Sequence, residues 1–187
     1  MNSFFKALEQ PEYVHVLLNH LPIVGLLVAL LGLVVALIFN QRAALLLALL
    51  LVTLTAASVW PVAEYGERGY DRVLAMADDD GQAYLKEHAR LADRWMFLYY
   101  ATAAAGVMAL VTGWKRPNYL RAAGILVALL AAGSLVAGGV IADYGGKVRH
   151  REFRTGPPPA NTGQSRSVGE PAGPGGFNAA GADGWLA

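Results

Sequence analysis

Four long stretches of the sequence consist almost entirely of apolar residues, and shorter polar stretches separate them. They cover residues 21–39, 43–62, 95–114 and 122–142. Each is close to the roughly 20 apolar residues that a helix needs to cross a lipid bilayer. Short connections join the first stretch to the second and the third to the fourth, which favours antiparallel neighbours. The pattern therefore predicts an all-α integral membrane protein, a four-helix bundle running up, down, up and down.

The connection between the second and third stretches, residues 63–94, is much longer and has a helical pattern of its own. Leu85, His88, Leu91 and Trp95 recur at the three- and four-residue spacing that places side chains on one helix face. Asp80 is a candidate N-cap for this helix. We expect an extramembrane helical connection here. We also expect the first, third and fourth helices to extend beyond the membrane on the N-terminal side.

The ends of the chain differ in character from the predicted bundle. Residues 1–12 form a short N-terminal segment, and residues 13–154 form the predicted transmembrane domain. Residues 155–187 are rich in Gly and Pro and have no hydrophobic periodicity, which is typical of a disordered or extended tail. Phe177, Trp185 and Leu186 are possible anchors on a partner protein; an untethered tail is the alternative.

Composition narrows the functional classes. Hydrophobic residues make up 55% of the chain and charged residues only 16%, whereas about a quarter of a soluble domain is charged. A net charge of +1 gives no indication of a nucleic-acid partner. The absence of cysteine excludes disulfides, thiolate-ligated iron–sulfur clusters and covalently attached c-type haem. The sequence has no nucleophile elbow, phosphate loop or helical H-E-x-x-H motif. The sequence therefore gives no indication of hydrolytic or group-transfer chemistry.

All four histidines of the chain, His15, His20, His88 and His150, are expected on one side of the membrane. Five residues of helix turn through about 140°, so His15 and His20 should not share a face. Each would then need a partner from another helix. Imidazoles from facing helices ligate haem iron in helical bundles. The histidines are therefore candidate ligands of one or two b-type haems, with copper or zinc as the alternative, because imidazole suits all three metals.

Basic residues and glycines near the level of the histidines are further candidates for cofactor binding. Basic side chains can pair with haem propionates; those at this level are Arg90, Arg94, Lys147, Arg149 and Arg151. Gly145 and Gly146 would let a flat cofactor approach the backbone.

Residues 15–25, "HVLLNHLPIVG", are similar to the opening signature of a family of small bacterial four-helix membrane proteins of unknown function. That signature resembles H-P-x-x-V-H-F-P-I, and this chain keeps His15, His20, Pro22 and Ile23 in register. It has Val16, Asn19 and Leu21 where the family often has Pro, Val and Phe.

Two later segments extend the resemblance to about residues 13–152. "KEHARLADRW" matches a histidine near the start of the family's third helix, and "YGGKVRH" resembles the end of its fourth. Relatives occur joined to cytochrome c-like or other redox domains. The resemblance implies a bacterial inner-membrane protein that works in electron transfer with haem. A larger membrane redox complex or a periplasmic electron carrier would be its partner.

The distribution of basic residues bears on the orientation in the membrane. The two short loops opposite the histidines carry only basic charges, Arg42 in one and Lys115, Arg116 and Arg121 in the other. Basic residues in short loops favour the cytoplasmic side. We therefore expect both termini and the histidines in the periplasm. The two functional hypotheses are a b-type cytochrome-like electron-transfer subunit and a non-redox structural or assembly subunit of a membrane complex.

Overall fold

A computed structural model describes residues 2–160 of the chain, and every regular element within them is helical. The segment 161–187, including the possible anchors Phe177, Trp185 and Leu186, lies outside the described residues. The elements are α1 (Asn2–Leu8), α2 (Pro11–Leu18), the π-helical turn η1 (Leu21–Gly25), α3 (Leu26–Phe39), α4 (Arg42–Ala57), α5 (Val59–Met76), α6 (Asp79–Trp95), α7 (Phe97–Lys115), η2 (Pro117–Tyr119), α8 (Leu120–Arg149) and η3 (Arg151–Phe153).

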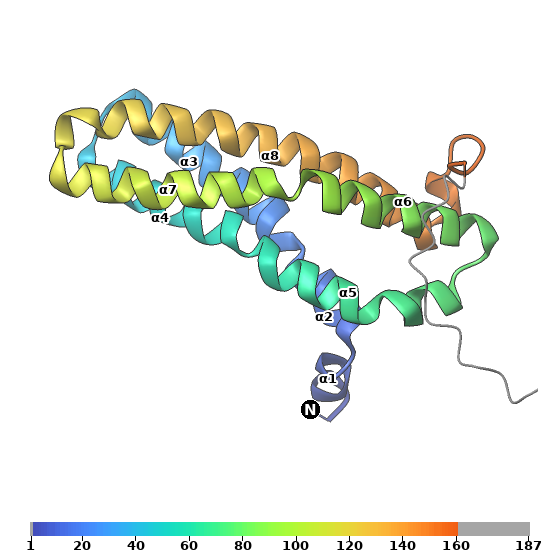
Figure 1. Ribbon diagram of the computed structural model, residues 1–187. Coiled ribbons are helices and arrows are strands. Elements are labelled where there is room, and N and C mark those ends of the chain that lie inside the picture. The colour runs from blue at the N-terminus through green and yellow to red at the C-terminus, as the bar shows by residue number, and fades with distance from the viewer. Residues whose placement is uncertain (1, 161–187) are drawn as a thin grey trace, which may run out of the picture.

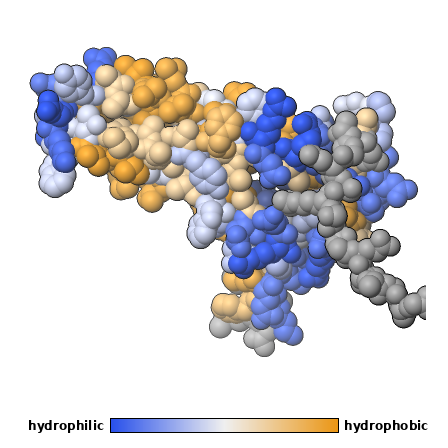
Figure 2. Space-filling view, viewed as in Figure 1, coloured by the Kyte–Doolittle hydropathy of each residue, from blue (hydrophilic) through white to orange (hydrophobic). Residues whose placement is uncertain are grey.

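These elements join into four long helices that run up, down, up and down (Figure 1). All four are long and apolar enough to cross a membrane: Pro11–Phe39, Arg42–Met76, Asp79–Lys115 and Pro117–Arg149. Apolar residues cover the surface of α3, α4, α7 and α8, and polar residues gather at both ends of the molecule (Figure 2). The prediction of an all-α bundle with four helices able to span a membrane is confirmed.

The apolar half is a closely packed bundle in which α3 and α7 each lie against α4 and α8. Its core is aliphatic, with Leu26, Leu33, Leu49, Val52 and Val127 almost completely buried. Small residues allow close approach between helices. Gly106 on α7, for example, meets Thr53 of α4 so closely that a Cβ there would collide with the threonine hydroxyl. By contrast, Gly133 and Gly139 on α8 face open space.

The outer half of the molecule is less compact because three of the four helices are interrupted near the edge of the apolar region. The interruptions lie at η1, which contains Pro22, at Ser58 and at Met96. Beyond them α2 packs on α5 and α6 packs on α8, and the two pairs diverge (Figure 1). The second helix thus also extends beyond the apolar region, through α5 to Met76. The expectation that only the other three helices extend was incomplete.

An ion-pair cluster ties the outer end of α8 to the start of α6. Arg154 donates two hydrogen bonds to Asp78, at 3.0 and 2.9 Å, and others to the carbonyls of Lys147 and Val148 at the end of α8. Asp78 also accepts a hydrogen bond from the backbone N–H of Gly81 and therefore caps α6. The N-cap is thus Asp78 rather than Asp80, because α6 begins at Asp79.

Candidate functional site: a paired-histidine cavity

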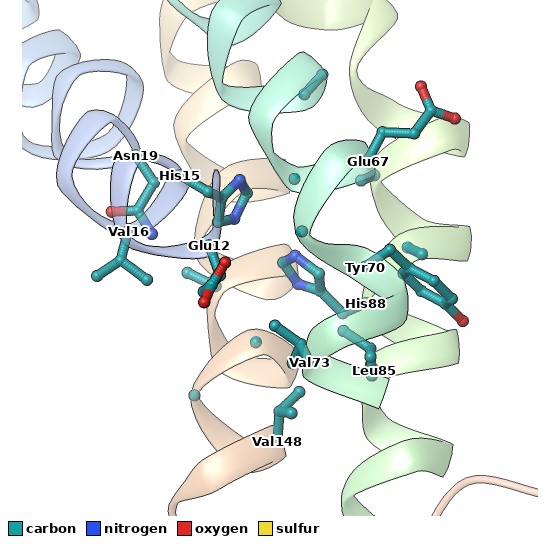
Figure 3. A pocket seen from close by; sticks show the side chains of 18 of the residues that line it. Glu12, His15, Val16, Asn19, Glu67, Tyr70, Val73, Leu85, His88 and Val148 are labelled. Atoms are coloured by element: carbon teal, nitrogen blue, oxygen red, sulfur yellow. The ribbon is translucent and has the colours of Figure 1, made fainter. Parts of the chain in front are cut away.

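A cavity of about 1060 Å³ lies between the α2–α5 pair and the α6–α8 pair. Ligand pockets in proteins typically have volumes of about 300–1,000 Å³, so this one is large enough for a sizeable organic cofactor. All four histidines of the chain line it. Figure 3 shows that His15 and His88 project into it from opposite sides.

His15 on α2 is held against the backbone of α5. Its Nδ1 lies 2.8 Å from the carbonyl oxygen of Val62. A carbonyl can only accept a hydrogen bond, so Nδ1 carries the hydrogen and Nε2 keeps a free lone pair. Gly66, one turn further along α5, lies against the same ring, where a Cβ would be 2.8 Å from Nδ1. The imidazole is therefore oriented by a hydrogen bond and by direct contact with the α5 backbone.

His88 on α6 is held in the same way by α8. Its Nδ1 lies 2.8 Å from the carbonyl oxygen of Ile141, and a Cβ on Gly145 would lie 3.0 Å from the ring. The carbonyl can only accept, so Nδ1 of His88 carries the hydrogen and Nε2 keeps a free lone pair, as in His15.

The two rings face each other across the cavity, with centroids 6.3 Å apart and planes at 88°. A metal–imidazole bond is about 2 Å long and the ligating nitrogen lies about 1 Å from its ring centre, so two imidazoles on opposite sides of one ion have centroids about 6 Å apart. Both rings also have Nδ1 occupied and Nε2 free. The spacing and the tautomers of the pair would allow the two Nε2 atoms to hold one metal ion between them.

The other two histidines are arranged differently. The Nδ1 of His20 bonds to the carbonyl of Val16 on its own helix, at 2.9 Å, and the side chain is exposed. The Nδ1 of His150 lies 2.9 Å from a carboxylate oxygen of Glu152, and its ring stacks on Phe153. Neither ring is in contact with another imidazole among the described residues. The structure therefore brings together two of the four candidate ligands.

The glycines and basic residues expected at the site divide into two groups. Gly145, Gly146 and Arg149 line the cavity. Gly145 is in contact with His88, while a Cβ on Gly146 would meet only Phe153 at 3.6 Å. Arg149 donates to the sulfur of Met76 at 3.7 Å, across the cavity mouth from α8 to α5.

Four basic candidates lie away from the cavity lining, and one of them, Arg151, pairs with Asp78 at 2.8 Å. Arg90 pairs with Glu87 at 2.5 Å, and Lys147 pairs with Asp143 at 2.6 Å. The guanidinium of Arg94 lies over the ring of Trp95, 5.3 Å from its centroid. Of the basic residues proposed to meet a cofactor carboxylate, Arg149 is thus the one in position.

Sequence reasoning missed several residues of the site, including Ile141 on α8 and others on α2 and α5. Arg72 lines the cavity and pairs with Glu12 at 3.1 Å. The second carboxylate oxygen of Glu12 is buried and has no hydrogen-bond partner among the described residues. Val62 and Gly66 were missed because α5 was not expected to reach the site. A usable signal was present, since residues 62–68 resemble residues 141–147.

Comparison of the chain with protein-family models, with curated proteins and with solved structures finds no match. The family resemblance seen in the sequence therefore stays a prediction.

Proposed function

We propose that this protein is a membrane-bound b-type cytochrome subunit that holds one haem between His15 and His88 and passes single electrons. The observation that carries the proposal is the facing pair of imidazoles, each with Nδ1 bonded to a main-chain carbonyl and Nε2 free. Bundles that bind haem present histidines from facing helices in this manner. Without cysteine in the chain, the haem would be held by ligation and packing alone.

The lining of the cavity has apolar walls and charged groups of both signs. The apolar walls include Val16, Val73 and Leu85, and the charged residues are Glu12, Glu67, Arg72, Asp93 and Arg149. Arginines form strong bonds to carboxylates, and Arg72 already pairs with Glu12, so Arg149 is the first candidate partner of a propionate. The bound haem would supply a one-electron couple, while the protein would supply the two nitrogen ligands, apolar walls and the charge of Arg149.

A zinc site is less well supported. Protein zinc sites use three or four ligands, and the described residues contain no group of three His, Cys, Asp or Glu side chains that could hold a metal ion. We further propose that the protein lies in a bacterial inner membrane with the cavity toward the periplasm. Its short, purely basic loops at the opposite end favour the cytoplasm. It would then exchange electrons with a periplasmic carrier or a larger membrane redox complex.

The test is a reduced-minus-oxidised absorption spectrum of the purified full-length protein, produced with ample haem. We expect a sharp α band and one haem per chain. Both should be lost in His15→Ala and in His88→Ala but kept in His20→Ala and His150→Ala. Absence of bound haem in the wild-type protein, or an unchanged spectrum in the His15→Ala and His88→Ala variants, would contradict the proposal.

A further inference from the structure

Two segments of the second and fourth helices share a seven-residue pattern. Residues 62–68 read VAEYGER and residues 141–147 read IADYGGK. Both have an aliphatic residue, alanine, an acid, tyrosine, glycine, a variable residue and a base, in that order. Agreement at six of these seven positions indicates an internal repeat, and repeats of this kind relate the two halves of many membrane proteins.

The structure of the two segments agrees position by position. The first residue of each, Val62 or Ile141, offers its carbonyl to the Nδ1 of a histidine at 2.8 Å. The fifth residue of each is the glycine that lies against the same imidazole, Gly66 or Gly145. Each glycine thus follows its carbonyl by four residues, which is about one helical turn.

The charged and aromatic positions of the repeat agree as well. The acid and the base form an ion pair within each helix, at 2.7 Å for Glu64 and Arg68 and at 2.6 Å for Asp143 and Lys147. In both copies the base also lies over the ring of the repeat's tyrosine, at 5.7 Å for Arg68 and 5.4 Å for Lys147.

The similarity continues one turn further out. Glu12, three residues before His15, packs against Gly69 of α5. Leu85, three residues before His88, clusters with Val148 of α8. Gly69 and Val148 each follow their repeat's first residue by seven positions. The α2–α5 and α6–α8 pairs are therefore two copies of one arrangement, placed on opposite sides of the cavity (Figure 1).

From this we infer that the haem site is assembled from two equivalent half-sites, one per helical hairpin, in which Gly66 and Gly145 are positioning residues for the ligand imidazoles. The inference rests on the proposed haem function and extends it. Hydrogen bonds that orient ligand histidines fix the tautomer and the ring orientation and raise the basicity of the ligand. The repeat supplies that hydrogen bond from a backbone carbonyl, and its glycine makes room for the ring beside the helix.

The physical basis is steric. A Cβ at position 66 would lie 2.8 Å from the Nδ1 of His15 and 2.9 Å from its Cε1; at position 145 it would lie 3.0 Å from the same two atoms of His88. These separations are shorter than van der Waals contact, so an alanine must push the ring away from the helix and from the carbonyl. Because the half-sites are equivalent, the two substitutions should have similar consequences.

The experiment compares Gly66→Ala and Gly145→Ala with two control variants. Gly133→Ala and Gly139→Ala are the controls, because both glycines lie on α8 outside the cavity lining and a methyl at either position points into open space. All four variants are made in the full chain.

The readouts are haem affinity, the optical spectrum and the midpoint potential. We expect Gly66→Ala and Gly145→Ala each to weaken haem binding about 10- to 100-fold, the usual effect of removing support from a metal ligand. Any haem that still binds should have an altered potential and spectrum. Gly133→Ala and Gly139→Ala should behave like the wild type. Wild-type affinity, spectrum and potential in both test variants would overturn the inference while leaving the proposed haem site intact.

A second measurement separates the half-sites from the haem proposal. In haem-free protein labelled with ¹⁵N-histidine, His15 and His88 should both show the Nδ1–H tautomer. Gly66→Ala should change the signal of His15 alone, and Gly145→Ala that of His88 alone. If the wild-type protein binds no haem, the proposed function fails, while these spectra still decide whether the repeats orient the imidazoles. Nε2–H tautomers in the wild type would refute the orientation of the imidazoles by the repeats.

Discussion

One polar contact joins α7 to α8 in the apolar half of the bundle. The hydroxyl oxygens of Thr102 and Ser134 are 2.9 Å apart, and both residues are fully buried. Each hydroxyl also lies within hydrogen-bond distance of the carbonyl four residues earlier in its own helix, at 2.8 Å for Thr102 and 3.0 Å for Ser134. Two hydroxyl hydrogens thus serve three contacts. The bond between the helices can form only when one of the two bonds within a helix is given up.

This count of hydrogens limits the coupling free energy expected between the two residues. A fully additional buried hydrogen bond would contribute about 0.5–1.5 kcal/mol, but here the net gain from joining the helices is smaller. Polar contacts between transmembrane helices average about 0.6 kcal/mol in double-mutant cycles, with a maximum near 1.7. We expect the coupling free energy between Thr102→Val and Ser134→Ala to be close to that average.

The assay is reversible unfolding in mixed micelles, with both single variants, the double variant and a control cycle. The control pairs Ser134→Ala with Thr55→Val, because the Thr55 hydroxyl bonds only to carbonyls of its own helix, at 2.7 and 3.2 Å. A coupling free energy no larger than in the control cycle would refute the hydrogen bond between Thr102 of α7 and Ser134 of α8. Coupling above about 2 kcal/mol would refute the hydrogen count, because it exceeds the largest value for such contacts.

Two further predictions concern the outer half of the protein. Hydrogen bonds from Arg154 and from the Gly81 backbone hold the pKa of Asp78 well below its ordinary value. A lowered folded-state pKa stabilises the protein at neutral pH, and the stabilisation is lost as the pH falls below about 4. Thermal unfolding should therefore show a larger fall in melting temperature on acidification for the wild type than for Asp78→Asn; equal falls would contradict the role of this ion pair. Arg149→Gln should lower the haem midpoint potential, because a nearby positive charge favours the reduced form. At roughly 10 Å a unit charge contributes about 0.4 kcal/mol in water and about 1.7 at an effective dielectric constant of 20, or about 20–70 mV. Redox titration checks this, with Arg121→Gln, at the opposite end of α8, as the control that should leave the potential unchanged.

Hydropathy was sufficient to predict the four helices because the demand for apolar residues in a membrane is strong and local. The same signal did not show that the second helix continues as α5 to Met76, because residues 63–76 are polar and were expected only as part of an extramembrane helical connection. The structure shows that this segment packs on α2 and presents Gly66 and Gly69 to it. Glycine adds little to a hydropathy pattern, so that pattern did not show that Gly66 and Gly69 are the positions where α5 meets α2.

The sequence indicated that the histidines form a site but not which of them face each other. Their type and position indicated a metal site, and their five-residue spacing separated His15 from His20. Which imidazole faces His15 depends on how the two hairpins are placed relative to each other, and no local pattern encodes that placement. The repeat at residues 62–68 and 141–147 does carry the information. It marks α5 and α8 as equivalent, and therefore their partner helices, with His15 and His88, as equivalent too.

The angle between the imidazole planes gives the most direct test of the haem site. His15 and His88 lie at 88° to each other. Ferric haem with two imidazoles at right angles gives a strongly anisotropic low-spin electron paramagnetic resonance signal, whereas parallel imidazoles give a rhombic one. Haem-loaded wild-type protein should show a single signal of the first kind, at one haem per chain, and it should disappear in His15→Ala and in His88→Ala. A high-spin signal, or a signal that persists in either variant, would contradict ligation by this pair, and a rhombic low-spin signal would contradict the right-angle arrangement of the two imidazoles.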